Sequence, residues 1–281
     1  MPEAKDAERQ DHPGWGVEAH TEFQRQMAAG IGESTTAGAA FFASHMQLIG
    51  FVNFVASLPK HVDASLDGFS KILDKEKEEP PSTVFQRGFD PFRPLVAEVL
   101  LTRAVDSYLT YVSELLALVF REKPATLLSG DKVEVRYALG FDSQEELREA
   151  IAEREVRRLA YLGMPELSKW FKDTLGFDLV PNRKRRQEIT RQVERRNLLT
   201  HHRGVIDHRF IDKCGRGEGP IGGKINVQEA GAQGYALLAE AVWDADERAA
   251  GKWALERSPL VTEDRVGDQL SLAREAEPVS T

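Results

Sequence analysis

The chain has a single cysteine, Cys214, among its 281 residues. One cysteine cannot form an internal disulfide, and the composition therefore fits a reducing compartment. The metal-binding motifs HExxH and CxxC are also missing, which argues against a metal centre built on a local spacing. The first residues, MPEAKDAERQDHPGWG, are acidic and polar and lack the apolar core of a secretory signal. We therefore expect a cytoplasmic protein that uses no metal and no other cofactor.

The sequence also lacks the alternating apolar and polar runs that form strands, and it contains no internal repeat. Apolar residues instead recur at steps of three and four after Pro94, a spacing typical of a bundle helix. This predicted seam consists of Leu101, Val105, Tyr108, Val112, Leu115 and Val119. Helices are predicted over residues 37–58, 61–79, 95–120, 143–163, 164–176, 183–203 and 235–249. The chain is therefore predicted to be all-α.

No charged residue occurs between Ser34 and Pro59, and the run AAFFASHMQLIGFVNFVASL approaches the length of a membrane span. His45, Gln47 and Asn53 lie inside it, and polar side chains are costly in hydrocarbon. Apolar residues recur at helical spacing within the run. We interpret the run as a buried helix of the protein and not as a membrane span, and we expect His45 to be a core or groove histidine.

Charge is distributed unevenly along the chain. The net charge is −8, from 37 basic and 45 acidic side chains, which argues against a protein whose whole surface binds polyanions. A predicted helix between the cap Asn182 and Gly204 nevertheless has only Glu188 and Glu194 as acidic residues. Its basic residues, counted to the end of the segment, are Arg183, Lys184, Arg185, Arg186, Arg191, Arg195, Arg196 and Arg203. A basic island on an acidic protein indicates a local anionic ligand.

A helical wheel separates the side chains of this basic helix. Arg196 falls within the apolar arc, where a guanidinium is costly unless it is paired or used. Arg191 and Arg195 face elsewhere and are expected to be solvated. Leu198 falls opposite the apolar arc, between the histidines at 201–202, and an outward leucine there would suit a dimer contact.

The stretch RRNLLTHHRGVIDHRF contains Arg196, Asn197 and His201. This spacing resembles the R-N-x-x-x-H signature of HEPN-domain proteins. Within that group it is similar to the toxin and phage-defence type, in which a glycine and GVV/GIVD-x-x-(F/Y) follow the motif helix. Here HHRGVIDHRFI supplies that continuation, and GPIGGKINVQEAGAQGYALL resembles the family's approach to its closing helix. The likeness covers residues 90–255 and is strongest over 193–211.

The resemblance implies an HEPN-like up-and-down four-helix bundle over residues 90–255, which pairs into a homodimer and brings two motif helices together. Residues 21–80 match nothing in the family and are predicted to form an additional N-terminal helical region. Polar, weakly periodic composition predicts disordered tails over residues 1–20 and over the acidic end, 256–281.

The same resemblance implies metal-independent cleavage of RNA, in which the 2′-oxygen attacks the adjacent phosphorus. His201 carries an imidazole, the side chain that most often accepts or donates a proton in catalysis. Arg196 can hold phosphate oxygens and stabilise developing charge. Asn197 lies one helical turn before the histidine, where its amide can orient the imidazole. Because Arg196 and His201 diverge by about 140° on an ideal helix, a second protomer is expected to complete the site.

RNA is the expected partner of this endoribonuclease, and basic residues near the motif would hold its backbone. The candidates for RNA binding are Arg183, Lys184, Arg185, Arg186, His202 and Arg203. A protein of the toxin or phage-defence type would in addition meet an antitoxin or another regulatory protein.

Three alternatives stay open on the residues alone. An HEPN-like bundle without activity could act as a scaffold that binds a partner protein or nucleic acid. The basic helix could bind DNA, although no helix-turn-helix spacing precedes it. A metal centre could use His201, His202, Asp207, His208 and Cys214, but adjacent helical histidines point about 100° apart and no metal-ligand spacing supports them.

Overall fold

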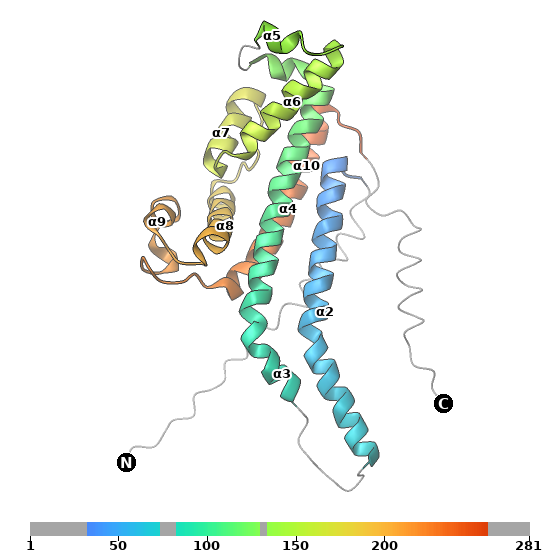
Figure 1. Ribbon diagram of the computed structural model, residues 1–281, viewed down its shortest axis with the longest axis vertical. Helices are drawn as coiled ribbons and strands as arrows, with labels where there is room; N and C mark the ends of the chain where they lie inside the picture. The colour runs from blue at the N-terminus through green and yellow to red at the C-terminus, as the bar shows by residue number, and fades with distance from the viewer. Residues whose placement is uncertain (1–32, 74–82, 130–133, 258–281) are drawn as a thin grey trace, which may run out of the picture. The chain divides into compact units, whose positions relative to one another are not determined.

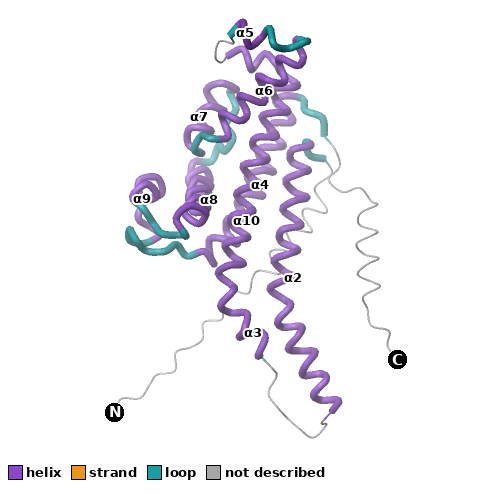
Figure 2. Tube along the Cα trace, in the orientation of Figure 1, coloured by secondary structure: helices purple, strands orange, loops and turns teal. Residues whose placement is uncertain are grey.

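The computed structural model describes residues 33–73, 83–129 and 134–257, and throughout these ranges the regular structure is helical (Figure 1). No strand is drawn in this part of the chain (Figure 2), and an isolated antiparallel bridge links Val205 to Lys224. The prediction of an all-α protein is therefore confirmed.

The predicted segments 95–120, 143–163, 164–176 and 183–203 agree closely with helices of the structure, whereas the last helix begins eight residues before the predicted 235–249 and three short helices were not predicted. The α-helices are α2 (Thr36–Leu73), α3 (Val84–Phe89), α4 (Arg93–Glu122), α5 (Val135–Ala138), α6 (Gln144–Ala160), α7 (Met164–Leu175), α8 (Arg183–His202), α9 (His208–Cys214) and α10 (Val227–Trp253). Short 3-10 helices are η1 (Asp90–Phe92), η2 (Pro124–Ser129) and η3 (Arg216–Glu218). Two disordered tails were predicted. The first, over 1–20, lies outside the described residues, and so does the second, over 256–281, from residue 258 onward.

Helix α4 is the centre of the packing. Helices α2, α6, α8 and α10 all contact it, and Figure 1 shows α2 and α10 running alongside it. Every residue of the predicted seam is buried on α4. Residues Ser34–Ser258 form one compact unit, so the region predicted as an N-terminal extension shares its core with the region predicted as a bundle.

Helix α2 is one continuous helix through Pro59, whereas the sequence predicts two helices that meet there. Proline removes one helical hydrogen bond and costs a helix interior about 3 kcal/mol. Contacts made by the second half of the helix offset this cost, because α3 packs against α2. The buried Asp63 carboxylate accepts hydrogen bonds from the backbone N–H groups of Phe85 and Gln86, each at 3.0 Å. Asp63 thus satisfies the free N–H groups at the start of α3.

A carboxylate from α10 caps the start of α2 in a similar way. Asp246, which is buried, accepts hydrogen bonds from the Ser34 hydroxyl at 2.8 Å and from the Thr35 backbone N–H at 2.9 Å. The Thr35 hydroxyl donates to its second oxygen at 2.5 Å. Gly38 is required beside this cap, because a Cβ atom there would lie 2.1 Å from the Ser34 hydroxyl oxygen.

His45 is a buried core residue, as predicted. Its ring lies between those of Phe41 and Tyr235, with centroid separations of 4.7 and 3.6 Å. Its Nε2 donates to the Tyr235 carbonyl at 3.0 Å, and the Tyr235 hydroxyl donates to the His45 carbonyl at 3.1 Å. These contacts tie α2 to α10. Burial lowers the pKa of His45 from 6.5 to about 4, against a smaller upward effect of the carbonyl.

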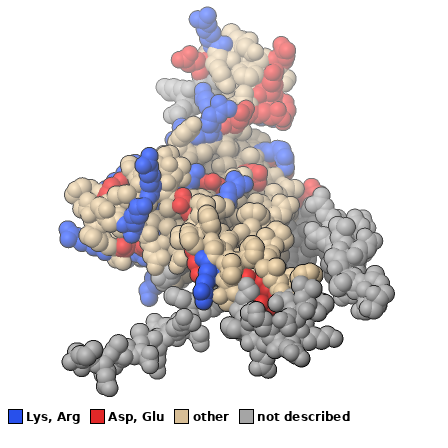
Figure 3. All heavy atoms as spheres, turned by 60° about the horizontal axis from the view of Figure 1, so that its bottom comes forward, with Lys and Arg blue, Asp and Glu red and all other residues tan. Residues whose placement is uncertain are grey.

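Length and composition alone would allow the helix Thr36–Phe69 to cross a membrane. One face of this helix packs into the core through residues such as Phe41 and Val52, whereas large apolar side chains from Phe51 onward are exposed. Only 28% of its apolar window is buried, so the prediction of a buried helix is confirmed only in part. The exposed set on α2, α3, η1 and α4 comprises Phe51, Phe54, Leu58, Leu66, Phe69, Val84, Phe85, Phe92 and Leu95. Figure 3, which brings the lower end of Figure 1 forward, shows uncharged side chains over much of this face.

Candidate functional site

Helix α8 carries the motif, and local signals set both of its ends. The Asn182 side chain accepts a hydrogen bond from the Arg185 backbone N–H at 3.0 Å, which confirms the predicted N-cap. At the other end Arg203 and Gly204 both take left-handed conformations, with φ of 54° and 75°. The Gly204 N–H donates to the Leu198 carbonyl at 2.9 Å and closes the helix.

The three motif residues line one cavity. Arg196, Asn197 and His201 face a space of about 470 Å³ between α4, the α6–α7 turn, α8 and α9. His201 is exposed, and the other two are half-buried. Apolar residues such as Leu116 and Phe210 form the remaining walls. A single chain therefore brings all three motif side chains to one cavity, although an ideal helix would separate Arg196 from His201 by about 140°.

The Arg196 guanidinium is held in place by α4. Its Nη2 lies 2.7 Å from Oδ1 of Asp106, and its Nη1 donates to the Asn197 side-chain oxygen at 3.3 Å. Both members of the ion pair keep about a quarter to a third of their side chains exposed, at 26% and 34%. Arg196 is therefore paired with a carboxylate, as expected for a guanidinium near the core, where an unpaired charge would be costly.

The Asn197 amide is hydrogen-bonded to Arg196 and does not orient His201 as predicted. Its oxygen accepts from Arg196, and within the described ranges no hydrogen bond joins it to His201. The exposed His201 ring is thus oriented by neither Asn197 nor a carboxylate in the part of the chain seen here. The adjacent His202, also exposed, has its Nε2 3.9 Å from Oδ2 of Asp207.

Three predictions from the helical wheel are wrong. Leu198 is only 3% exposed, so it belongs to the interior and offers no dimer contact. Arg195, expected to be solvated, is buried and pairs with Glu218 at 2.5 Å. Arg191 is half-buried and pairs with Glu188 at 2.8 Å. A wheel assumes one covered face, whereas α4, α7, α9 and α10 contact α8 from several directions.

The candidate RNA-binding residues divide into two groups. His202 and Arg203 are exposed beside the motif. The other four lie at the opposite end of α8, about 25 Å along the axis at 1.5 Å per residue. Of these, Arg183 and Lys184 are exposed, while Arg185 pairs with Glu240 on α10 at 3.0 Å.

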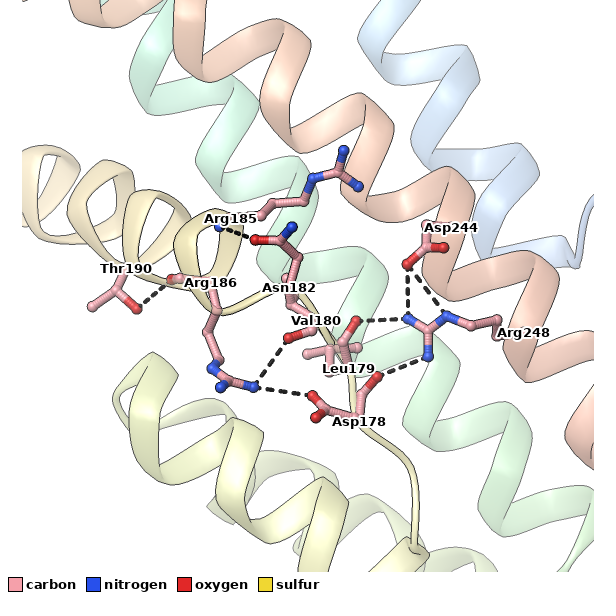
Figure 4. Close-up of polar contacts among 9 residues, drawn as sticks. All are labelled: Asp178, Leu179, Val180, Asn182, Arg185, Arg186, Thr190, Asp244 and Arg248. Carbon is pink, nitrogen blue, oxygen red and sulfur yellow. Dashed lines mark hydrogen bonds and ion pairs between the residues drawn. The ribbon is translucent and has the colours of Figure 1, made fainter.

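Arg186 stabilises the loop that precedes α8. Its guanidinium binds the Asp178 carboxylate at 3.1 Å and the Val180 carbonyl at 3.0 Å (Figure 4). From the other side, Arg248 on α10 donates to the carbonyl oxygens of Asp178 and Leu179 at 2.8 and 3.1 Å. Arg186 thus makes structural contacts that orient the start of the motif helix.

Sequence reasoning missed the partners that other elements supply to the cavity. Glu194 and Lys213 form an ion pair within its wall, and Asp106 reaches Arg196 from α4. No local pattern marks these residues, because each pairs with a residue on a different helix.

The alternative of a metal centre needs a cluster of side chains that can act as metal ligands. Among the described residues no group of three or more His, Cys, Asp or Glu side chains could hold a metal ion. Burial, with a further contribution from Glu194, raises the pKa of the Cys214 thiol to about 11. The thiol is therefore protonated at neutral pH and is a poor nucleophile.

Comparison with known proteins found no matching family model, no matching curated protein and no matching solved structure.

Proposed function

We propose that this protein is a metal-independent endoribonuclease of the HEPN type, with a bundle of up-and-down helices over residues 90–255. The observation that carries the proposal is the shared cavity of Arg196, Asn197 and His201. It combines an exposed imidazole, a positioned guanidinium and open space beside them. These are the groups that RNA transesterification needs: a proton acceptor or donor and a cation for the phosphate.

The proposed reaction is an internal displacement at phosphorus. A His201 imidazole takes the proton of the 2′-hydroxyl as the 2′-oxygen bonds to phosphorus. A second, protonated imidazole donates a proton to the 5′-oxygen as the bond from phosphorus to that oxygen breaks. The products are a 2′,3′-cyclic phosphate and a 5′-hydroxyl. Arg196 stabilises the extra negative charge on the phosphate oxygens, and Asp106 fixes the guanidinium for that contact.

A homodimer supplies the second imidazole in this proposal. One chain carries one motif histidine, whereas the displacement uses one proton acceptor and one proton donor. We propose a cytoplasmic homodimer that acts on RNA as a toxin or phage-defence effector and that an antitoxin or another regulatory protein controls. Residues around the exposed His201 would form its contact, since Leu198 is buried.

A second candidate function is a scaffold without activity. It is favoured by the 2.7 Å ion pair with Asp106, which occupies one edge of the Arg196 guanidinium. In that function the arginine would hold α8 to α4, and the cavity would bind a partner protein or nucleic acid without chemistry.

The test uses labelled RNA incubated with the full chain in EDTA. We expect cleavage that survives chelation and disappears in Arg196→Ala and in His201→Ala. His61→Ala is the matched control, because this histidine is also exposed but lies on α2, outside the lining of the cavity, and it should retain cleavage. RNA binding without cleavage would select the scaffold, and loss of activity in EDTA would select metal chemistry.

A further inference from the structure

A second cavity lies between α7, α8 and α9, next to the motif cavity. It encloses about 550 Å³. Its lining contains no acidic side chain but includes five cationic ones: Lys169, Lys172, Arg186, Arg191 and Lys213. Such a collection from three separate helices creates a positive potential inside a concave site, where an anion is attracted.

Carboxylates outside the cavity wall neutralise only part of this charge. Arg186, Arg191 and Lys213 have acidic partners at Asp178, at Glu188 and at Glu194 respectively. Lys169 and Lys172, one turn apart on α7, are exposed and have no ion pair within the described ranges. The two lysines therefore leave the cavity with unbalanced positive charge.

A buried hydroxyl in the same wall is an independent sign of a ligand. Ser168 is 6% exposed, and its Oγ has no hydrogen-bond partner among the described residues. A buried hydroxyl without a partner carries a desolvation penalty of about 1–3 kcal/mol. Ser168 is one of the residues that line this cavity, with Lys169 and Lys172. A ligand oxygen that accepts the Ser168 hydrogen bond and faces the lysines would remove that penalty.

We propose that this cavity binds a phosphate group of the RNA backbone. A phosphate offers several acceptor oxygens to ammonium, guanidinium and hydroxyl donors at once. Lys213 lines both cavities, so the two sites adjoin. Along α8, the step from Thr190 in this cavity to Arg196 in the motif cavity is about 9 Å at 1.5 Å per residue. A single strand held here would continue into the motif cavity within a few nucleotides.

The assignment to RNA rests on the proposed ribonuclease function, whereas phosphate binding by the cavity does not. The test therefore measures binding in the His201→Ala background, so that cleavage cannot interfere. One probe is a short fluorescein-labelled single-stranded RNA followed by anisotropy over a range of salt concentrations. The other is inorganic phosphate followed by calorimetry. Circular dichroism checks that each variant is folded.

The decisive comparison is between two double variants with the same loss of charge. Lys169→Gln with Lys172→Gln removes the unpaired cations of the cavity, and Lys123→Gln with Arg136→Gln removes two exposed cations from the same protein that line neither this cavity nor the motif cavity. We expect the first to weaken RNA binding about tenfold and to lower the salt slope by about 1.4, from two lost phosphate contacts. The second should weaken binding by less than threefold. Ser168→Ala should weaken phosphate binding without any change of charge.

Each outcome bears on the inference. Equal loss of RNA binding in both double variants would overturn it, because the effect would then be one of overall charge. Unchanged binding of both probes in the Lys169→Gln, Lys172→Gln variant would also overturn it. If this variant loses phosphate binding but the native protein does not bind RNA, the cavity is a phosphate site for a small ligand and the RNA assignment is wrong. Cleavage that persists in Arg196→Ala would refute the proposed function, but the conclusion about phosphate binding by this cavity would still stand.

Discussion

Protonation of His45 is expected to make the protein less stable as the pH falls. The ring is 1% exposed between Phe41 and Tyr235, and its Nε2 already donates to a carbonyl. A carbonyl can only accept, so Nδ1 is the unprotonated nitrogen, and it is buried without a partner in the part of the chain described. A second proton would place a charge in that apolar position, which is why burial lowers the pKa from 6.5 to about 4.

The size of the effect follows from the two pKa values. A shift of about 2.5 units at 1.36 kcal/mol per unit corresponds to about 3 kcal/mol. Because the folded-state pKa is lower than the unfolded one, neutral His45 contributes its full stability above pH 6.5. That contribution is lost as the pH falls from about 6.5 to about 4. Between about pH 7.5 and about pH 5 the loss amounts to about 2 kcal/mol.

The assay is urea unfolding of native protein and of His45→Gln at these two pH values. Glutamine can still donate to the Tyr235 carbonyl but does not titrate. We expect the variant to be less stable at the higher pH and to lose about 2 kcal/mol less than native protein on acidification. His61→Gln, on the exposed side of the same helix, should follow the native pH dependence. If the stability gap between native protein and His45→Gln were the same at both pH values, the reasoning about a neutral buried ring would be refuted.

Three further predictions concern packing and the site. Gly231→Ala should destabilise the protein by about 1–3 kcal/mol in thermal unfolding, because its Cβ would lie 2.9 Å from the Ala97 carbonyl oxygen. Gly251→Ala is the control: a Cβ there would meet open space, so this variant should be neutral or stabilising. Leu198→Ala should lower the free energy of unfolding, measured in urea, by about 2–5 kcal/mol, since the side chain is buried. A variant that kept native stability but no longer formed the proposed dimer would show that Leu198 is an outward dimer contact after all. Asp106→Asn should reduce RNA cleavage while leaving RNA bound, because the Arg196 guanidinium loses its charged anchor; undiminished cleavage would show that the anchor is not needed.

Local sequence was enough to predict α4, α6, α7 and α8 with their ends, but not the short helices α3, α5 and α9 or the start of α10. The step of three and four residues along α4 predicted its buried seam, because a side chain's face on a helix depends only on its spacing from its neighbours. The cap at Asn182 formed as predicted, since a capping side chain reaches N–H groups within three residues of itself. The motif residues were likewise predictable as a set, because they lie on one stretch of one helix.

Tertiary structure alone decided what those helices meet. A wheel cannot show that α8 is covered from several sides, so the burial of Leu198 and Arg195 was not predictable from their positions. Nor does the sequence bring Asp106 to Arg196, or the lysines of α7 to Lys213, because these residues are far apart along the chain. Burial and ion pairing depend on the packing of separate elements, whereas helix formation and capping depend on neighbours within a turn, and only the latter can be worked out from the order of residues.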